Sequence, residues 1–163
     1  MARWVGISPL EEIRPSITAF LWGVGAMLPL GLGLAWMLTT NWAPMRGLVA
    51  LVTEQIGPSI AGYSMAQLAL LALAAGVSEE ILFRGVVQTA LAQVVPAGLA
   101  LIAASVGFGL VHFASRVYAA VAGIIGVYLG ALFLLQGSLL APIVTHALYD
   151  LVALLCVARR AAT

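Results

Sequence analysis

The chain has 163 residues, of which 63% are hydrophobic and only 8% are charged. A water-soluble domain carries roughly a quarter charged residues, so a soluble chain of this composition could not cover its own surface. We therefore expect lipid to be the solvent for most of the chain. The net charge of +1 provides no basic field for nucleic acid, which we exclude as a partner.

The N-terminal part of the sequence predicts a retained membrane helix over residues 17–38. This uncharged stretch of about 22 residues is long enough to cross a bilayer and too long for the apolar region of a cleavable signal. Residues 45–60 are ambiguous, because a short apolar run lies between Arg46 and Glu54. An interfacial helix, a re-entrant helix and a poor span all stay open for this segment.

Four more helices are expected further along the chain. A long helical stretch over residues 64–95 exceeds one bilayer crossing, so we expect it to break or tilt near residues 76–78. Three further apolar stretches follow at residues 97–113, 117–135 and 139–158. The sequence thus predicts an all-α, polytopic transmembrane helix bundle of five to six spans.

Six ionisable residues fall inside these apolar helices or at their edges. They are Glu79, Glu80, Arg84, His112, His146 and Asp150. A charged side chain at the centre of a membrane helix costs about 2.5–3.5 kcal/mol on insertion scales. We therefore expect these side chains to face the interior of the bundle and to neutralise one another.

Their spacing predicts which groups meet. Glu80 and Arg84 are four residues apart, so they share a helix face and can form an ion pair. Glu79 is turned by about 100° from Glu80 and can point at a different neighbour. His146 and Asp150 also share a face. One carboxylate, Glu79, is therefore left available for chemistry.

A carboxylate and two histidines in a low-dielectric cavity form a water-activating arrangement. Glu79 is the natural general base, and a histidine such as His112 can orient the water. The other histidine, His146, could stabilise an oxyanion, with Asp150 holding it in place. The set Glu79, His112 and His146 could equally bind a divalent metal such as zinc. The sequence leaves both mechanisms open.

Three short motifs connect these residues to a known family. Residues 79–84 match EExxxR, residues 108–112 match FxxxH and residues 146–150 match HxxxN/D. In this order, on successive helices, they resemble the CPBP family over residues 64–158. This family contains the CAAX proteases and bacteriocin-processing endopeptidases, also called the Abi family.

The resemblance implies roles for the individual residues. Glu79 would be the catalytic base, His112 would help it to position water, and His146 and Asp150 would form the oxyanion side. Asp150 stands where asparagine is common in the family. Because an aspartate donates a hydrogen bond only when it is protonated, an ionised Asp150 would instead orient His146 or bind a metal.

The remaining site residues are expected to be structural. Glu80 and Arg84 would form an internal ion pair, and Phe108 would pack beside them. The three tyrosines of the later helices could line a cavity, but we expect them to pack in the core, as we do the single cysteine; these residues are Tyr118, Tyr128, Tyr149 and Cys156.

The resulting hypothesis is an intramembrane endopeptidase, glutamate- or metal-dependent, within a single membrane domain of residues 1–163. Residues 64–158 form the family-like catalytic core, and residues 17–38 add an N-terminal helix. The substrate would be a membrane-associated peptide or protein, of CAAX type or bacteriocin-like. The seven basic residues are all arginine and alanine is abundant, which suggests a bacterial source and hence a bacterial cytoplasmic membrane. A non-catalytic binding or immunity protein of the same fold and a small proton-coupled carrier are the alternatives.

Overall fold

The structure, a computed structural model, describes residue 6 and residues 8–162. Across this part of the chain all regular structure is helical, and no strand is present. The helices are η2 (Pro9–Glu12), α1 (Ile17–Thr39), α2 (Ala43–Ile60), α3 (Met65–Glu80), η3 (Ile81–Gln88), α4 (Thr89–Ala92), α5 (Ala97–Val111), α6 (Arg116–Gln136) and α7 (Leu140–Ala161). The predicted all-α fold is confirmed.

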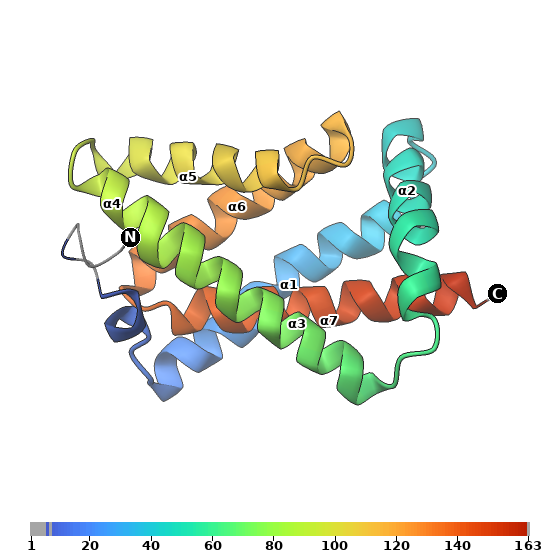
Figure 1. Ribbon diagram of the computed structural model, residues 1–163, viewed down its shortest axis with the longest axis horizontal. Coiled ribbons are helices and arrows are strands. Elements are labelled where there is room, and N and C mark those ends of the chain that lie inside the picture. Colours follow the sequence, from blue (N-terminus) through green and yellow to red (C-terminus); the bar gives the residue numbers. More distant parts are fainter. Residues whose placement is uncertain (1–5, 7, 163) are drawn as a thin grey trace.

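The long helices pack into one bundle (Figure 1). α7 is its central element, because α1, α2 and α3 all pack against it, while α5 packs along α6. α3 continues through η3 and α4 as one long helix that crosses the view diagonally. α2 runs across the direction of α7, near the C-terminal end of that helix. This arrangement places the C-terminal end of α3, the end of α5 and the first half of α7 around a common interior.

Four helices are long and apolar enough to cross a membrane, namely 17–39, 65–92, 116–136 and 140–161. Among the described residues, α2 is not one of them. α5 is apolar but has only 15 residues and ends at Val111, two residues before the predicted end. The bundle is polytopic, as predicted, with four such helices and the shorter α5.

Of the two alternatives for residues 76–78, a break or a tilt, the break is wrong. α3 continues as a regular helix through this region, and Ser78 Oγ donates to the carbonyl oxygen of Ala74 at 2.7 Å. Gly76 instead permits close packing, because a Cβ atom built there would lie 3.0 Å from the backbone nitrogen of Ala147 on α7. The irregular part is η3, a π-helical segment that begins at Ile81. Such segments are frequent at functional sites.

The last two helices follow the predicted boundaries closely. α6 ends at Gln136 and is capped by Gly137, whose φ of 57° lies in the left-handed region that glycine adopts without strain. α7 runs to Ala161, beyond the predicted end at residue 158, so that Arg159 and Arg160 form its last turn. Basic side chains are favourable there, because the helix dipole places partial negative charge at this end.

Candidate active site

The end of α5 sets the orientation of His112. The backbone N–H of His112 donates to Leu110 rather than to Phe108, four residues back, so the Phe108 carbonyl loses its usual helical partner. The His112 ring takes that position, with Nδ1 lying 2.8 Å from the Phe108 oxygen. A carbonyl oxygen only accepts, so Nδ1 carries the proton. In the neutral ring Nε2 is therefore left with a lone pair.

Glu79 lies between the two histidines. Its Oε2 atom is 3.5 Å from His112 Nε2 and 3.9 Å from His146 Nε2. Both separations exceed the 2.7–3.2 Å that is typical of a direct hydrogen bond. Glu79 Oε2 is buried and makes no hydrogen bond to any described residue. The structure thus brings together an unpartnered carboxylate oxygen and two ring nitrogens contributed by α3, α5 and α7.

Glu80 forms a separate, buried ion pair with Arg84. Its Oε1 atom accepts from Arg84 Nη1 at 2.8 Å and from His146 Nδ1 at 2.8 Å. Arg84 also donates from Nη2 to the Gly126 carbonyl at 2.8 Å. The Glu80 and Arg84 side chains are 0% and 1% exposed, so neither reaches a bound molecule. The predicted ion pair is present, and it also fixes the orientation of the His146 ring.

Asp150 lies on the other side of His146. Its Oδ2 atom is 3.4 Å from His146 Nε2, as the four-residue spacing on α7 predicts. The side chains of Glu79, His112 and Asp150 are 29%, 25% and 28% exposed, in contrast to the buried pair of Glu80 and Arg84. These three side chains can therefore contact a molecule that enters the interior.

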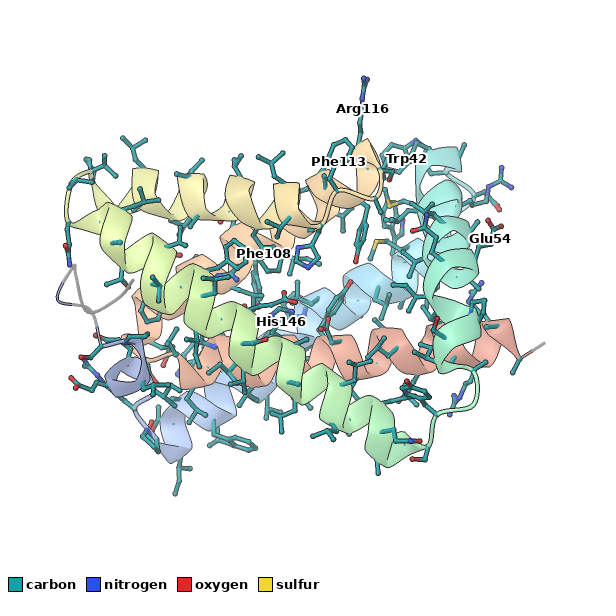
Figure 2. All side chains as sticks on the ribbon, viewed as in Figure 1. Trp42, Glu54, Phe108, Phe113, Arg116 and His146 are labelled. Carbon is teal, nitrogen blue, oxygen red and sulfur yellow. The ribbon has the colours of Figure 1, made fainter. Side chains whose placement is uncertain are left out.

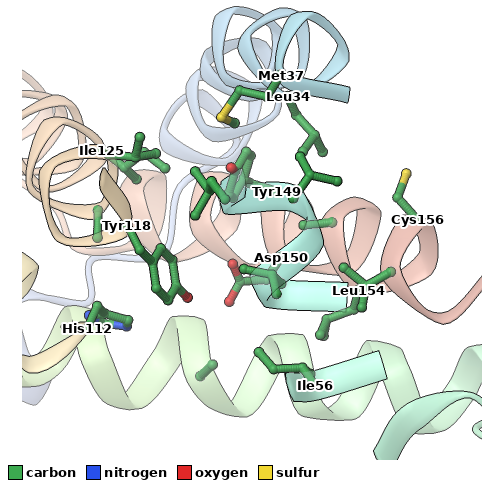
Figure 3. Close-up of a pocket in the computed structure, with 18 of the residues that line it drawn as sticks. Leu34, Met37, Ile56, His112, Tyr118, Ile125, Tyr149, Asp150, Leu154 and Cys156 are labelled. Atoms are coloured by element: carbon green, nitrogen blue, oxygen red, sulfur yellow. The ribbon is translucent and has the colours of Figure 1, made fainter. Parts of the chain in front are cut away.

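They face an elongated cavity of about 310 Å³ (Figure 3). Glu79, His112, His146 and Asp150 line its polar part, and mainly apolar side chains of α1, α2, α6 and α7 line the rest. Cys156, which was expected to pack in the core, also lines the cavity. The cavity could accommodate an apolar peptide segment next to the polar group.

Phe108 packs behind the histidines, as predicted, and Figure 2 shows it in the bundle interior close to His146. Its ring meets Phe83 edge-on with the ring centroids 5.0 Å apart. The Arg84 guanidinium carbon lies 4.7 Å from the Phe108 centroid, within cation–π range. Phe108 thus contacts both Arg84 and His112. The ring centroids of Phe108 and His112 lie 4.4 Å apart.

The side-chain arrangement does not match a metal-ligand set. Among the described residues, no group of three or more histidine, cysteine, aspartate or glutamate side chains is arranged to hold a metal ion. Zinc dependence stays a prediction for measurement.

Two of the three tyrosines line the cavity, which was the alternative to the core packing expected of them. Tyr118 and Tyr149 contribute to its wall, and the Tyr118 ring meets the His112 ring edge-on at 6.2 Å between centroids. Tyr128 has a structural contact, since its hydroxyl donates to the Ala26 carbonyl at 2.7 Å. No sequence motif distinguishes these roles, because they depend on which side of α6 and α7 meets the cavity.

Comparison with known proteins connects this site to a family. A family model described as type II CAAX prenyl endopeptidase Rce1-like matches residues 61–152, more than half of the chain. No curated protein and no solved structure matches the chain. The matched range contains all seven site residues predicted above, from Glu79 to Asp150.

Proposed function

The chain belongs to the type II CAAX prenyl endopeptidase Rce1-like family, and on that premise we propose that it is an intramembrane endopeptidase that hydrolyses a peptide bond with water activated by Glu79. It is an integral membrane protein whose substrate is a membrane-associated peptide or protein. We further propose a CAAX-type or bacteriocin-like sequence as the substrate and, from the composition, a bacterial cytoplasmic membrane as the location.

One observation carries this proposal: Glu79 Oε2 is unpartnered and faces the Nε2 atoms of His112 and His146 at the cavity wall. A buried carboxylate oxygen without a hydrogen bond is costly, and such exceptions call for an explanation. Glu80 Oε2 also lacks a hydrogen bond, but the Glu80 side chain is 0% exposed and does not line the cavity, so only the Glu79 oxygen is accessible to a substrate. A general base supplies one, because the base must keep a lone pair available for the proton it takes.

His112 completes the water site. Its Nδ1 proton is donated to the Phe108 carbonyl at 2.8 Å, so Nε2 can accept a hydrogen bond. A water between Glu79 and His112 would donate one proton to the carboxylate and the other to the ring. Both donations direct the oxygen lone pairs of the water towards a substrate carbonyl in the cavity.

The reaction then needs no further group to balance it. The water oxygen bonds to the carbonyl carbon while Glu79 takes a proton, which gives a tetrahedral intermediate with an oxyanion. Glu79 returns that proton to the amide nitrogen as the carbon–nitrogen bond breaks. His146 stands on the oxyanion side, where Glu80 and Asp150 face its two ring nitrogens at 2.8 and 3.4 Å. Between these two carboxylates the ring acts as an imidazolium, so Nε2 carries a proton for the oxyanion while Nδ1 donates to Glu80.

The test is cleavage of an internally quenched, farnesylated peptide that ends in a CAAX sequence, with the protein in lipid nanodiscs. Glu79→Gln should lower kcat by about 10²–10⁴-fold, the usual contribution of a general base. Glu54→Gln is the matched control, because Glu54 lies exposed on α2 and does not line the cavity. Undiminished cleavage by Glu79→Gln would refute the proposal.

Two further arms separate the alternatives. Cleavage that survives chelation is expected for a glutamate-activated water, whereas stoichiometric zinc with loss of cleavage on chelation would favour the metal mechanism. If the wild type cleaves neither this peptide nor a broad peptide library, the binding or immunity alternative gains support.

A further inference from the structure

The oxyanion side of the proposed site lacks a donor at residue 150. A developing oxyanion is stabilised by hydrogen-bond donors aimed at it. An ionised aspartate has none, and Asp150 Oδ2 already lies 3.4 Å from His146 Nε2. His146 donates its Nδ1 proton to Glu80, so only one of its nitrogens faces the cavity. A second donor must come from another part of the cavity wall.

Tyr118 is placed to be that donor. It lies in the first turn of α6, where its backbone N–H donates to the Ser115 hydroxyl that caps the helix at 3.1 Å. The position of its ring is further defined by the edge-on contact with His112. Tyr118 and Asp150 line the same cavity, and Figure 3 shows the Tyr118 hydroxyl pointing towards the Asp150 carboxylate.

The Tyr118 hydroxyl also has no competing partner. Within residue 6 and residues 8–162, no side chain or backbone group forms a hydrogen bond with it; its only ring contact is with His112. Tyr128, further along the same helix, contrasts with it, because its hydroxyl is engaged by the Ala26 carbonyl. Tyr118 thus combines a ring held in place with a donor directed into the polar part of the cavity.

Other hydroxyl groups in the cavity are less suited to this role. Thr53 is on α2 beside Gly57, which packs against Ala161 at the far end of α7. Tyr149 directly precedes Asp150, so the helical period turns it by about 100° away from the face that carries His146 and Asp150.

We propose that Tyr118 is a catalytic residue whose hydroxyl donates a hydrogen bond to the oxyanion of the tetrahedral intermediate, in place of the donor that Asp150 cannot provide. This inference rests on the proposed endopeptidase function. In this arrangement Tyr118 and His146 bind the oxyanion from two sides, and Asp150 positions His146. The hydroxyl makes a hydrogen bond only and exchanges no proton in the reaction.

The experiment is a double-mutant cycle on residues 118 and 150 with the farnesylated CAAX peptide. Tyr118→Phe should lower kcat by about 10²–10³-fold with little change in KM, as for the loss of one oxyanion donor. Tyr63→Phe is the control, because Tyr63 is exposed in the turn before α3. In the Asp150→Asn background, where the new amide supplies a donor, Tyr118→Phe should lower kcat by less than about tenfold.

Three results would overturn the inference. The first is a Tyr118→Phe variant that keeps kcat within about threefold of wild type, far from the loss of one oxyanion donor. The second is a Tyr118→Phe substitution that lowers kcat equally in the wild-type and Asp150→Asn backgrounds. The third is an Asp150→Asn variant without activity, since the amide would then fail as a donor. Equal thermal unfolding of all variants in nanodiscs separates chemistry from folding. Failure of the endopeptidase proposal itself looks different, because cleavage would then be absent in the wild type or independent of Glu79.

Discussion

Removal of the Arg84 charge should destabilise the bundle far more than the loss of ordinary membrane hydrogen bonds. Arg84 makes two hydrogen bonds, to Glu80 and to the Gly126 carbonyl, both at 2.8 Å. Hydrogen bonds between membrane helices contribute about 0.6 kcal/mol each on average and at most about 1.7 kcal/mol. Arg84→Met would also leave the Glu80 carboxylate, which is 0% exposed, without its arginine and with His146 as its remaining hydrogen-bond donor.

Breaking a buried ion pair by removing one partner costs about 3–5 kcal/mol, most of it from the stranded charge. We therefore expect Arg84→Met to lower the free energy of unfolding by about 3–5 kcal/mol. The double variant Glu80→Gln/Arg84→Met should recover about 2 kcal/mol of that loss, because it removes the stranded carboxylate. The amide oxygen introduced at position 80 could still accept from His146, so the ring orientation would survive.

The assay is reversible unfolding in mixed micelles, with both single variants and the double variant measured under the same conditions. A positive coupling energy between positions 80 and 84 is the expected result. If Arg84→Met lowers the free energy of unfolding by less than about 1 kcal/mol, the buried charge is not the source of the cost. The same holds if adding Glu80→Gln to Arg84→Met restores none of the lost stability.

The other two predictions concern packing and access. Gly76→Ala should lower the free energy of unfolding by about 1–3 kcal/mol, because its Cβ would lie 3.0 Å from an α7 backbone atom. Gly98→Ala is the control and should leave the free energy of unfolding unchanged, because open space surrounds that position. Equal effects of the two substitutions on unfolding would contradict the close contact at Gly76. Cys156 lines the cavity and is the only cysteine, so N-ethylmaleimide should inhibit peptide cleavage by the wild type but not by Cys156→Ser, and the peptide should slow the labelling. Full activity of the labelled protein would refute this.

The sequence predicts those parts of the structure that depend on local pattern. Long apolar stretches define α1, α6 and α7 because a bilayer requires about 20 apolar residues in a helix. The ion pair between Glu80 and Arg84 follows from their four-residue spacing, and the contact between His146 and Asp150 follows from the same rule. Both pairs lie within single helices, so no knowledge of tertiary structure is needed to predict them.

The features that the sequence does not predict all involve distant residues. The π-helical segment η3 is anchored to α6 by hydrogen bonds from Arg84 to Gly126 and from Gln88 to Gly130, each across 42 residues. No local pattern contains these partners. The same holds for the cavity position of Tyr118, which depends on how α6 meets α7. In the sequence alone, Gly76 looks like a helix breaker, because glycine has a low helix propensity. The close packing that it permits against α7 depends on a distant part of the chain.

The early end of α5 means that a main-chain atom selects the tautomer of His112. When a side chain orients a catalytic histidine, a single point mutation can abolish that control. The Phe108 carbonyl is present whatever residue occupies position 108, so replacement of the phenylalanine can change packing without removing the acceptor. Only a change in where the helix ends would remove it. The orientation of the proposed water site therefore depends on where α5 ends. Most substitutions at position 108 itself should leave it unchanged.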